Sequence, residues 1–252
     1  MRLSYELELL GHHWTLREYQ FAYIAGFGVA WAWLSFRLWR AGVPAWRFAI
    51  IPLYAFSSIR HGSHLFGWLT LGRFNSGVLY GGLFGALAAG ALAWRWLYRR
   101  WVPGRQWFDD GMVALILVFA ATRIGCHVSG CCHGTVAPEG WPSVTYPLDT
   151  PGFSPLMELR EVPLHPTALY EALGLGELLL LGLWLRPRLA PGTLGWLLLS
   201  GYAGLRFLLE FIRADVRGGM VLGLSPSQVL SLAVLCVAAL ALWVKRHPEQ
   251  AT

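Results

Sequence analysis

Charged residues are scarce in this sequence. Asp, Glu, Lys and Arg make up 13% of its 252 residues, whereas soluble domains contain roughly 25%. Hydrophobic residues make up 56%, tryptophan occurs 14 times, and the mean hydropathy is +0.47. These values exclude an ordinary soluble globular domain and predict an all-α polytopic membrane protein.

The sequence also lacks internal repeats, low-complexity tracts and a separate soluble segment, so we expect a single integral membrane domain over residues 1–252. A cleavable signal peptide is not expected either. The first residues carry Glu6, Glu8 and His12, and they lack an apolar core followed by a small-residue cleavage site. The first span is therefore predicted to direct membrane insertion.

Seven apolar segments have the length of roughly 17 to 25 residues that is needed to cross a bilayer. They cover approximately residues 18–39, 46–70, 76–98, 110–128, 165–186, 192–213 and 225–244. The long connection 129–164 joins the fourth and fifth segments. Ser225 followed by Pro226 is typical of a helix start, and His165-Pro166 opens the fifth span in a similar way.

Basic residues are distributed unevenly over the connections between these segments. Eleven lie in the first, third and fifth connections and in the C-terminal tail, against six on the opposite side. The eleven are Arg37, Arg40, Arg47, Arg95, Arg99, Arg100, Arg105, Arg186, Arg188, Lys245 and Arg246. The positive-inside rule therefore predicts an outer N-terminus, an outer 129–164 loop and a cytoplasmic C-terminus in a bacterial inner membrane. Basic edges beside anionic lipid account for the net charge of +6, so no nucleic-acid partner is expected.

Several polar side chains lie inside the apolar segments, where they are costly and usually functional. They are Arg60, His61, His64, Tyr80, Arg123, Tyr202, Arg206 and Glu210. The spacing of Tyr202, Arg206, Glu210 and Arg213 predicts one stripe that faces the helix bundle. Arg206 and Glu210 form an internal salt bridge in one interpretation. In the other, Arg206 and Arg123 bind a phosphate from two helices, since Arg123 has no acid next to it in the sequence.

The third segment contains a stripe of small residues. Gly77, Gly81, Gly85 and Ala89 recur at four-residue spacing, which predicts close packing against another helix. Tyr80 is the polar exception in this segment. Its hydroxyl requires a partner, which is either a neighbouring helix or a substrate oxygen.

The stretch TRIGCHVSGCCHG, residues 122–134, combines thiols, imidazoles and glycines at the end of the fourth span. Cys126, Cys131 and Cys132 do not have the paired CxxC spacing of a zinc site, so no metal or cofactor is expected. A disulfide is possible on the outer face of a bacterial membrane, although the neighbouring Cys131 and Cys132 are not both expected to reach Cys126. Two interpretations remain: the cysteines are small packing residues, or they take part in nucleophilic or acid–base chemistry beside His127 and His133.

The chain resembles the phosphatidylglycerol:prolipoprotein diacylglyceryl transferase family over nearly its whole length. The motifs that carry the resemblance are EYQFAYIAGF from Glu18, SGVLYGGLFG from Ser76, RIGC and GCCHG within 123–134, HPTALYEA from His165 and GYAGLRFLLEFIR from Gly201. The resemblance implies seven spans with an outer N-terminus, and phosphatidylglycerol and a secreted lipobox-containing precursor as substrates. It also implies the reaction, in which the lipobox cysteine thiol attacks the glyceryl carbon, forms a thioether and expels glycerol phosphate.

The resemblance also suggests site residues. Arg123, Gly134, Arg206 and Glu210 match positions that are essential or important in the family, and Tyr19, Tyr202 and His165 match motif positions. Cys126 and Cys131 stand where the family has asparagine and glutamate, and Tyr80 stands where it has a histidine. We therefore take Arg206, Glu210, Tyr80, His165, Cys126 and Cys131 as candidate catalytic residues, and Arg123, Gly134, Tyr19, Tyr202, Arg60, Gly81 and Gly82 as candidate substrate-binding residues.

Thiol attack on carbon requires a thiolate, and the ordinary pKa of cysteine is about 8.5, so a base or a positive field is needed. His165, His127 and His133 suit that role at neutral pH better than Tyr80 does. Arginines stabilise the departing phosphate, with Glu210 orienting its partner on the same helix. The 129–164 loop is expected to contact the acceptor.

Two alternatives to this reaction stay open. In one, Cys126 or Cys131 is itself the nucleophile and forms a lipidated enzyme that passes the group to another acceptor. In the other, the protein binds anionic lipid through Arg123 and Arg206 without catalysis.

Overall fold

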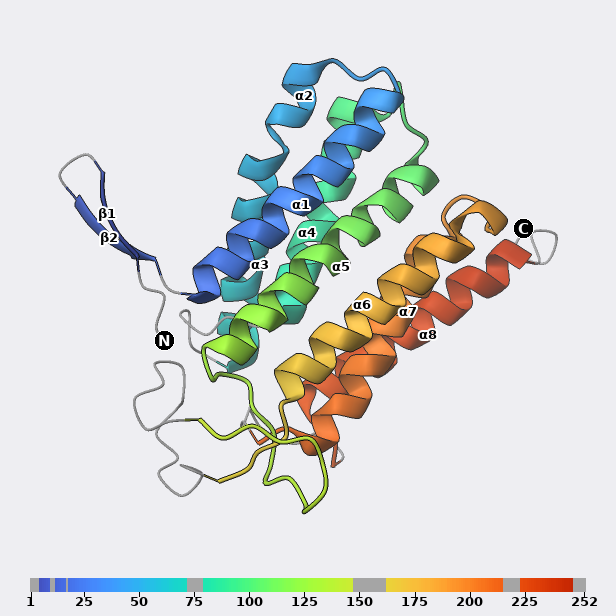
Figure 1. The fold of residues 1–252 in the computed structure, drawn as a ribbon. Coiled ribbons are helices and arrows are strands. Elements are labelled where there is room, and N and C mark those ends of the chain that lie inside the picture. Colours follow the sequence, from blue (N-terminus) through green and yellow to red (C-terminus); the bar gives the residue numbers. More distant parts are fainter. Residues whose placement is uncertain are drawn as a thin grey trace.

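The elements of this chain are almost all helices (Figure 1). The computed structural model describes residues 5–9, 12–16, 18–71, 79–146, 162–214 and 223–246. Seven long helices lie within these ranges: α1 (Glu18–Arg40), α3 (Ile51–Leu71), α4 (Leu79–Ala93), α5 (Gly104–Val128), α6 (Thr167–Leu185), α7 (Thr193–Leu209) and α8 (Pro226–Arg246). Shorter elements are α2 (Ala45–Ala49), the π-helical turn η1 (Trp94–Tyr98), and the 3-10 turns η3 (Arg186–Arg188) and η4 (Glu210–Ile212). An antiparallel hairpin of β1 (Tyr5–Leu9) and β2 (His12–Leu16) precedes α1.

Five of the described helices are long and apolar enough to cross a membrane. They are Tyr19–Arg40, Gly104–Val128, Thr167–Arg188, Thr193–Ile212 and Pro226–Arg246. The helices α3 and α4 take the places of the second and third predicted spans. The prediction of an all-α polytopic membrane protein is therefore confirmed, with the short hairpin as an addition that the sequence pattern did not indicate.

The second predicted span is not one continuous helix, because its start forms a separate short helix. The segment 46–70 is divided at Ile50 into α2 and α3. Pro52 lies in the first turn of α3, where its missing N–H removes no intrahelical hydrogen bond. The outer loop 129–164 is described only in part, because residues 147–161 lie outside the described ranges.

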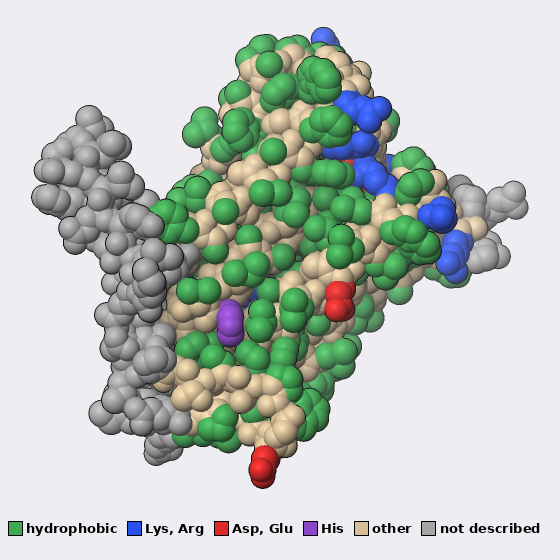
Figure 2. Space-filling view, in the orientation of Figure 1, with side chains coloured by type: hydrophobic (Ala, Val, Ile, Leu, Met, Phe, Trp, Pro, Cys, Tyr) green, Lys and Arg blue, Asp and Glu red, His purple; other side chains and the backbone are tan. Residues whose placement is uncertain are grey.

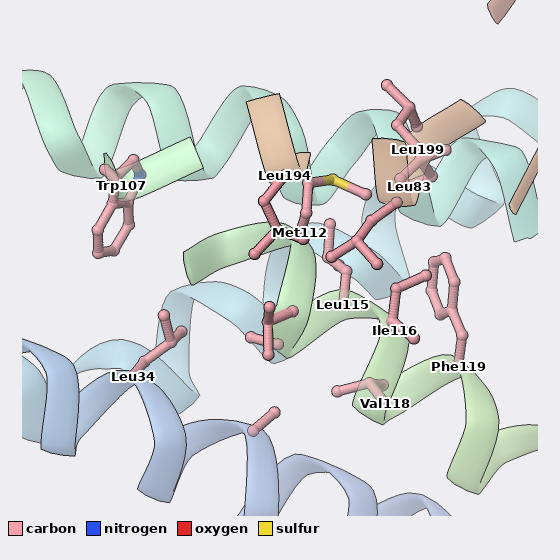
Figure 3. Close-up of a cluster of buried hydrophobic side chains, with 14 of the residues drawn as sticks. Leu34, Leu83, Trp107, Met112, Leu115, Ile116, Val118, Phe119, Leu194 and Leu199 are labelled. Atoms are coloured by element: carbon pink, nitrogen blue, oxygen red, sulfur yellow. The ribbon is translucent and has the colours of Figure 1, made fainter. Parts of the chain in front are cut away.

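Helix α5 lies between α1, α3 and α4 on one side and α6, α7 and α8 on the other (Figure 1). Of its most apolar window, 61% is buried, against 22% to 39% for the other four candidate spans. Its apolar side chains pack against both groups (Figure 3). Among them, Met112 and Ile116 are 1% exposed and contact a cluster that includes Leu83 of α4 and Leu194 of α7. Residues of α5 therefore reach the interior from one end of the bundle to the other.

Small residues let α3 and α4 lie in close contact. A Cβ atom added at Gly62 would lie 2.5 Å from the carbonyl oxygen of Gly81 and 2.9 Å from the Cα atom of Gly85. The predicted packing role of the glycine stripe is thus confirmed for these positions, whereas Gly77 lies outside the described residues. A Cβ atom at Gly82 would also touch α3. Cβ atoms at Gly81 and Gly82 would thus both meet α3, and the expectation that these glycines contact substrate stays a prediction.

Two aspartates near the start of α5 explain why this helix extends beyond the predicted segment 110–128. Asp109 and Asp110 mark the edge of the apolar sequence, yet both are buried because their carboxylates have partners. Asp109 accepts hydrogen bonds from the backbone N–H groups of Gly192 and Gly195, each at 2.6 Å. These donors lie at the start of α7, where helical N–H groups have no partner within the helix.

Asp110 joins α1 to the turn after α6. Its carboxylate accepts hydrogen bonds from Arg37 Nε at 3.0 and 3.2 Å and also pairs with Arg186. Figure 2 shows Lys and Arg side chains gathered at this end of the molecule, near the end of α1 and the start of α7. The outer loop lies at the other end (Figure 1). This separation agrees with the predicted orientation.

Asp110→Asn is expected to lower the midpoint of thermal unfolding in detergent by about 4 to 8 °C. Loss of one charge-assisted partner costs about 2 kcal/mol, and each kcal/mol shifts the midpoint by roughly 2 to 4 °C in a chain of this size. Glu177→Gln on the exposed face of α6 is the matched control and should leave the midpoint unchanged. Equal midpoints for both variants would show that the Asp110 contacts do not stabilise the bundle.

Candidate active site

A network of buried ion pairs lies at the end of the bundle that carries the outer loop. Arg123 of α5 pairs with Glu171 of α6, with Nε 3.0 Å from Oε2. Arg206 of α7 pairs with Glu210, with Nη2 2.6 Å from Oε2. Arg213 lies between the two carboxylates, 3.7 Å from Glu171 and 4.0 Å from Glu210. The side chains of all five are at most 8% exposed. The predicted inward-facing stripe on α7 is thus confirmed.

The charges in this network do not balance. Within the described part of the chain, the ion pairs bring together three guanidinium groups and two carboxylates. Nη1 of Arg206 and the hydroxyl of Tyr202 are buried and have no hydrogen-bond partner among the described residues. Buried polar groups normally have partners, and an uncompensated buried charge is costly. The network is therefore suited to receive an anion.

Arg123 has no acid next to it in the sequence, but the fold supplies one. Glu171 is distant from Arg123 in the sequence, but α6 packs against α5 and brings the two side chains together. Glu171 is fully buried. It is the glutamate of the HPTALYEA motif, one helical turn after Thr167, and both face inward. A carboxylate within an apolar span was the signal that could have identified it.

The start of α8 holds the second ion pair in place. Ser227 Oγ accepts a hydrogen bond from Arg206 Nη2 at 3.4 Å, and Ser225 Oγ donates one to Glu210 Oε1 at 2.9 Å. Ser225 Oγ also accepts the backbone N–H of Gln228 at 3.2 Å. The predicted N-terminal cap of the last helix is thus confirmed, and the same serine orients a carboxylate of the site.

Tyr80 finds its partner on a neighbouring helix. Its hydroxyl lies 2.5 Å from Ser231 Oγ of α8. Its ring packs against that of Tyr202, with 5.8 Å between the ring centroids. Tyr80 is 2% exposed and lies within electrostatic reach of Arg206 and Glu171. The structure therefore places Tyr80 in the wall of the network.

Gly134 lies where three segments of the outer end meet. Its N–H donates to the carbonyl oxygen of His165 at 2.8 Å, and it forms an antiparallel bridge with Arg213. A Cβ atom added here would lie 2.6 Å from the carbonyl oxygen of Ile212 and 2.7 Å from Cβ of His165. Only glycine fits this crossing, which holds the start of α6 and the end of η4 together.

Gly134→Ala is expected to lower the thermal unfolding midpoint in detergent by about 4 to 8 °C, because overpacking a tight site costs roughly 2 kcal/mol. Gly204→Ala on α7 is the control, since a Cβ atom there meets nothing within 4 Å. That control should be neutral or slightly stabilising, as expected for glycine replaced by alanine within a helix. A midpoint for Gly134→Ala at or above that of Gly204→Ala would contradict the close approach at this crossing.

The three clustered cysteines lie together at the end of α5, with Cys126 in its last turn and Cys131 and Cys132 just beyond it. None of the three is in a disulfide within the described residues. Their Sγ atoms are all within 4.8 Å of one another, so Cys131 and Cys132 both approach Cys126. The reason is a tight reversal of the chain. Gly130 has a φ of 72° and Cys132 a φ of 60°, and the N–H of Cys131 donates to the carbonyl oxygen of Cys126 at 3.0 Å.

Side chains from two other segments hold this turn. Thr167 Oγ1 donates to the carbonyl oxygen of Cys132 at 2.6 Å. The Tyr146 hydroxyl lies 3.3 Å from the carbonyl oxygen of His127 and 3.4 Å from its Nδ1. Burial raises the pKa of Tyr146 to about 12, so the hydroxyl remains a hydrogen-bond donor. The pKa of the Cys132 thiol is lowered, because the thiols of Cys126 and of its neighbour in the chain hydrogen-bond to its sulfur and arginine side chains lie near it.

Three candidate residues lie outside the ion-pair network. His165 is buried, but its ring contacts Tyr170, with Nδ1 3.4 Å from the hydroxyl, and Trp141, in an edge-on arrangement. Arg60 is exposed on α3 and takes no part in the ion-pair network formed by the described residues of α5, α6, α7 and η4. Tyr19 is 36% exposed at the start of α1 and lies within electrostatic reach of the thiols and of the α5 arginine.

Fold and site together define a polytopic membrane protein with a buried, arginine-rich site at its outer-loop end. Sequence comparison agrees with this class. The model of the family "Prolipoprotein diacylglyceryl transferase" matches residues 7–244. The chain belongs to this family.

Curated relatives extend over most of the chain. A phosphatidylglycerol–prolipoprotein diacylglyceryl transferase from Coxiella burnetii (strain Dugway 5J108-111) is 30% identical over 278 aligned residues, which cover 98% of this chain and 97% of the relative. The enzyme of that name from Pseudoalteromonas atlantica is 28% identical, with 94% of this chain and 88% of the relative covered. One from Methylibium petroleiphilum is 33% identical over 66% of this chain and 60% of the relative.

Proposed function

We propose that this protein transfers a diacylglyceryl group from phosphatidylglycerol to the cysteine thiol of a secreted lipobox-containing prolipoprotein in the bacterial inner membrane, releasing glycerol phosphate. The observation that carries the proposal is the excess of buried positive charge around Arg206, whose Nη1 points at no partner among the described residues. Family membership supports the same substrates, since the similar curated proteins are named for phosphatidylglycerol and prolipoprotein.

The phosphate is the group that this network is suited to hold. Guanidinium groups bind phosphate oxygens through two parallel hydrogen bonds, and they keep their charge when buried. Glu210 and Glu171 fix the orientation of Arg206 and Arg123 through pairs of 2.6 and 3.0 Å. Donors held in place before the reaction stabilise the charge that develops on the leaving phosphate. In this proposal both arginines bind substrate and Arg206 contacts the leaving group.

An apolar cavity of about 370 Å³ supplies room for an acyl chain. It lies between α1, α3, α4 and α5, and Phe27, Ile59, Ala86 and Val118 are among its lining residues. Val118 precedes Arg123 by five residues on α5, which corresponds to about 7.5 Å along the helix axis. In this proposal, a lipid with its phosphate at Arg123 extends its acyl chains toward this cavity.

The remaining candidates take supporting positions in this proposal. Tyr80 and Tyr202 form the wall of the phosphate site. The backbone of His165 holds Gly134, and its ring faces the outer loop. Tyr19 lies near the thiols at the start of α1.

The decisive assay is release of glycerol phosphate from phosphatidylglycerol by the purified protein in detergent. A lipobox peptide serves as acceptor, and the same peptide with its cysteine changed to serine is the control. Release that requires the peptide thiol is the expected result. Release without any thiol acceptor would assign the reaction to the protein's own cysteines or to another acceptor. Lipid binding without release would refute catalysis and leave an anionic-lipid-binding protein.

A further inference from the structure

We propose that Cys126, Cys131 and Cys132 bind one Zn²⁺ ion and that this ion holds the acceptor thiol as a thiolate, an inference that rests on the proposed transferase function. None of the three cysteines is in a disulfide in the described chain, and their Sγ atoms lie within 4.8 Å of one another. Zn–S bonds of about 2.3 Å place the sulfur atoms of a tetrahedral site about 3.8 Å apart. Small side-chain rotations are enough to close that difference.

The turn that brings the sulfurs together is held in an unusual conformation. Cys132 has a φ of 60° and is the one non-glycine residue with positive φ in the described chain. Such a conformation persists only where the surroundings enforce it, and it often marks a functional site. Here Thr167 Oγ1 binds the carbonyl oxygen of Cys132 at 2.6 Å, and Cys131 is anchored to the end of α5.

The cluster leaves a fourth coordination position open. In the part of the chain that the structure describes, no histidine nitrogen or carboxylate oxygen joins the three sulfurs in one group. Three protein ligands with an open fourth position are the arrangement of catalytic zinc sites, whereas structural sites are closed by four. Cys131 and Cys132 are partly exposed, so an external thiol can approach the open position.

Arginine side chains lie near the proposed zinc–thiolate site. Zn²⁺ with three thiolates carries one negative charge, and nearby guanidinium groups favour thiolates over thiols. Arg123 precedes Cys126 by three residues on α5, so both side chains lie on one helix face. Arg213 also lies within electrostatic reach of Cys132. Arginine side chains thus stand beside the thiolates that the ion requires.

Several candidate bases for the acceptor thiol have other contacts in the described chain. The Tyr80 hydroxyl is bound to Ser231. The His165 ring faces Tyr170, and Nδ1 of His133 lies 3.2 Å from a backbone carbonyl oxygen. A metal ion replaces the base, because a thiol that coordinates Zn²⁺ is deprotonated.

The reaction then balances without a further reactant. The acceptor thiol releases its proton to water when it binds the ion. Its sulfur forms a bond to the glyceryl carbon, and the bond from that carbon to the phosphate oxygen breaks. Glycerol phosphate leaves with the electron pair, and its charge is received by Arg206 and Arg123.

Metal binding is tested on the purified full-length chain, reduced and then dialysed against Zn²⁺. One equivalent of zinc is expected in the wild type and in Cys236→Ser, whose thiol is exposed on α8. Cys131→Ser and Cys132→Ser should bind zinc on the order of 100-fold more weakly or worse. Loss of even an outer-shell partner lowers metal affinity by roughly 10- to 100-fold, and a direct ligand contributes more. Co²⁺ in place of Zn²⁺ should give thiolate charge-transfer absorption in the wild type and in Cys236→Ser, but not in Cys131→Ser or Cys132→Ser. The proposal would be overturned if the reduced wild-type protein binds no zinc. It would also be overturned if two of the three cysteines form a disulfide during dialysis and zinc is not bound.

The role of the ion is tested in the glycerol phosphate assay after removal of zinc with a chelator. Release that stops and returns on addition of Zn²⁺, with phosphatidylglycerol binding unchanged, is expected. A metal-free protein that transfers at the wild-type rate would overturn the thiolate role. A zinc-loaded protein that binds lipid and peptide but releases no glycerol phosphate would instead refute the proposed transferase function, while the zinc site stands.

Discussion

Arg206→Lys is expected to lower the rate of peptide-dependent glycerol phosphate release by about 100-fold or more at saturating phosphatidylglycerol. Lysine keeps the positive charge but lacks the two planar NH₂ groups of arginine. One of these groups pairs with Glu210, and the other faces the proposed phosphate site. In the structure, Nη2 of Arg206 lies 2.6 Å from Glu210, while Nη1 has no partner among the described residues. The turnover rate at saturation should therefore fall more than lipid affinity does.

The matched control is Arg105→Lys, because this arginine is exposed at the opposite end of the bundle. It should release glycerol phosphate at the wild-type rate. Thermal unfolding of both variants separates a folding defect from a loss of chemistry. A folded Arg206→Lys protein with wild-type turnover would exclude Arg206 as the residue that stabilises the leaving phosphate.

The fold was accessible from the sequence because bilayer crossing imposes a simple pattern. Apolar segments of sufficient length fixed the approximate position of every long helix in the described chain. The stripe of Tyr202, Arg206 and Glu210 was predicted to face inward from its four-residue spacing alone, and it does. Likewise, Ser225 caps the last helix as its position before proline indicated.

The partners of these residues depend on how helices pack, and sequence spacing does not encode that. Glu171 pairs with Arg123 because α6 lies against α5, although the two residues are far apart in the chain. The thiol cluster depends on a reversal with positive φ at Gly130 and Cys132, which spacing between cysteines does not indicate. In both cases the residue types were visible, but the geometry that gives them a chemical role was not.

Glu171→Gln is expected to lower the thermal unfolding midpoint in detergent and to reduce glycerol phosphate release by about 100-fold or more. The carboxylate is fully buried between Arg123, at 3.0 Å, and Arg213, at 3.7 Å. Glutamine keeps the shape but removes the charge. Breaking a buried ion pair on one side costs about 3 to 5 kcal/mol, because the remaining charge is left uncompensated.

The effect of added glycerol phosphate on the unfolding midpoint shows whether Glu171 positions the phosphate-binding arginines or only stabilises the fold. In Glu171→Gln, an anion bound at the arginines replaces the missing negative charge, so glycerol phosphate should raise the unfolding midpoint of this variant more than that of the wild type. Glu177→Gln, on the exposed face of the same helix, should behave as wild type in both measurements. If glycerol phosphate shifts all three midpoints equally, Glu171 does not share its arginines with the phosphate, and the anion site must be sought elsewhere in the bundle.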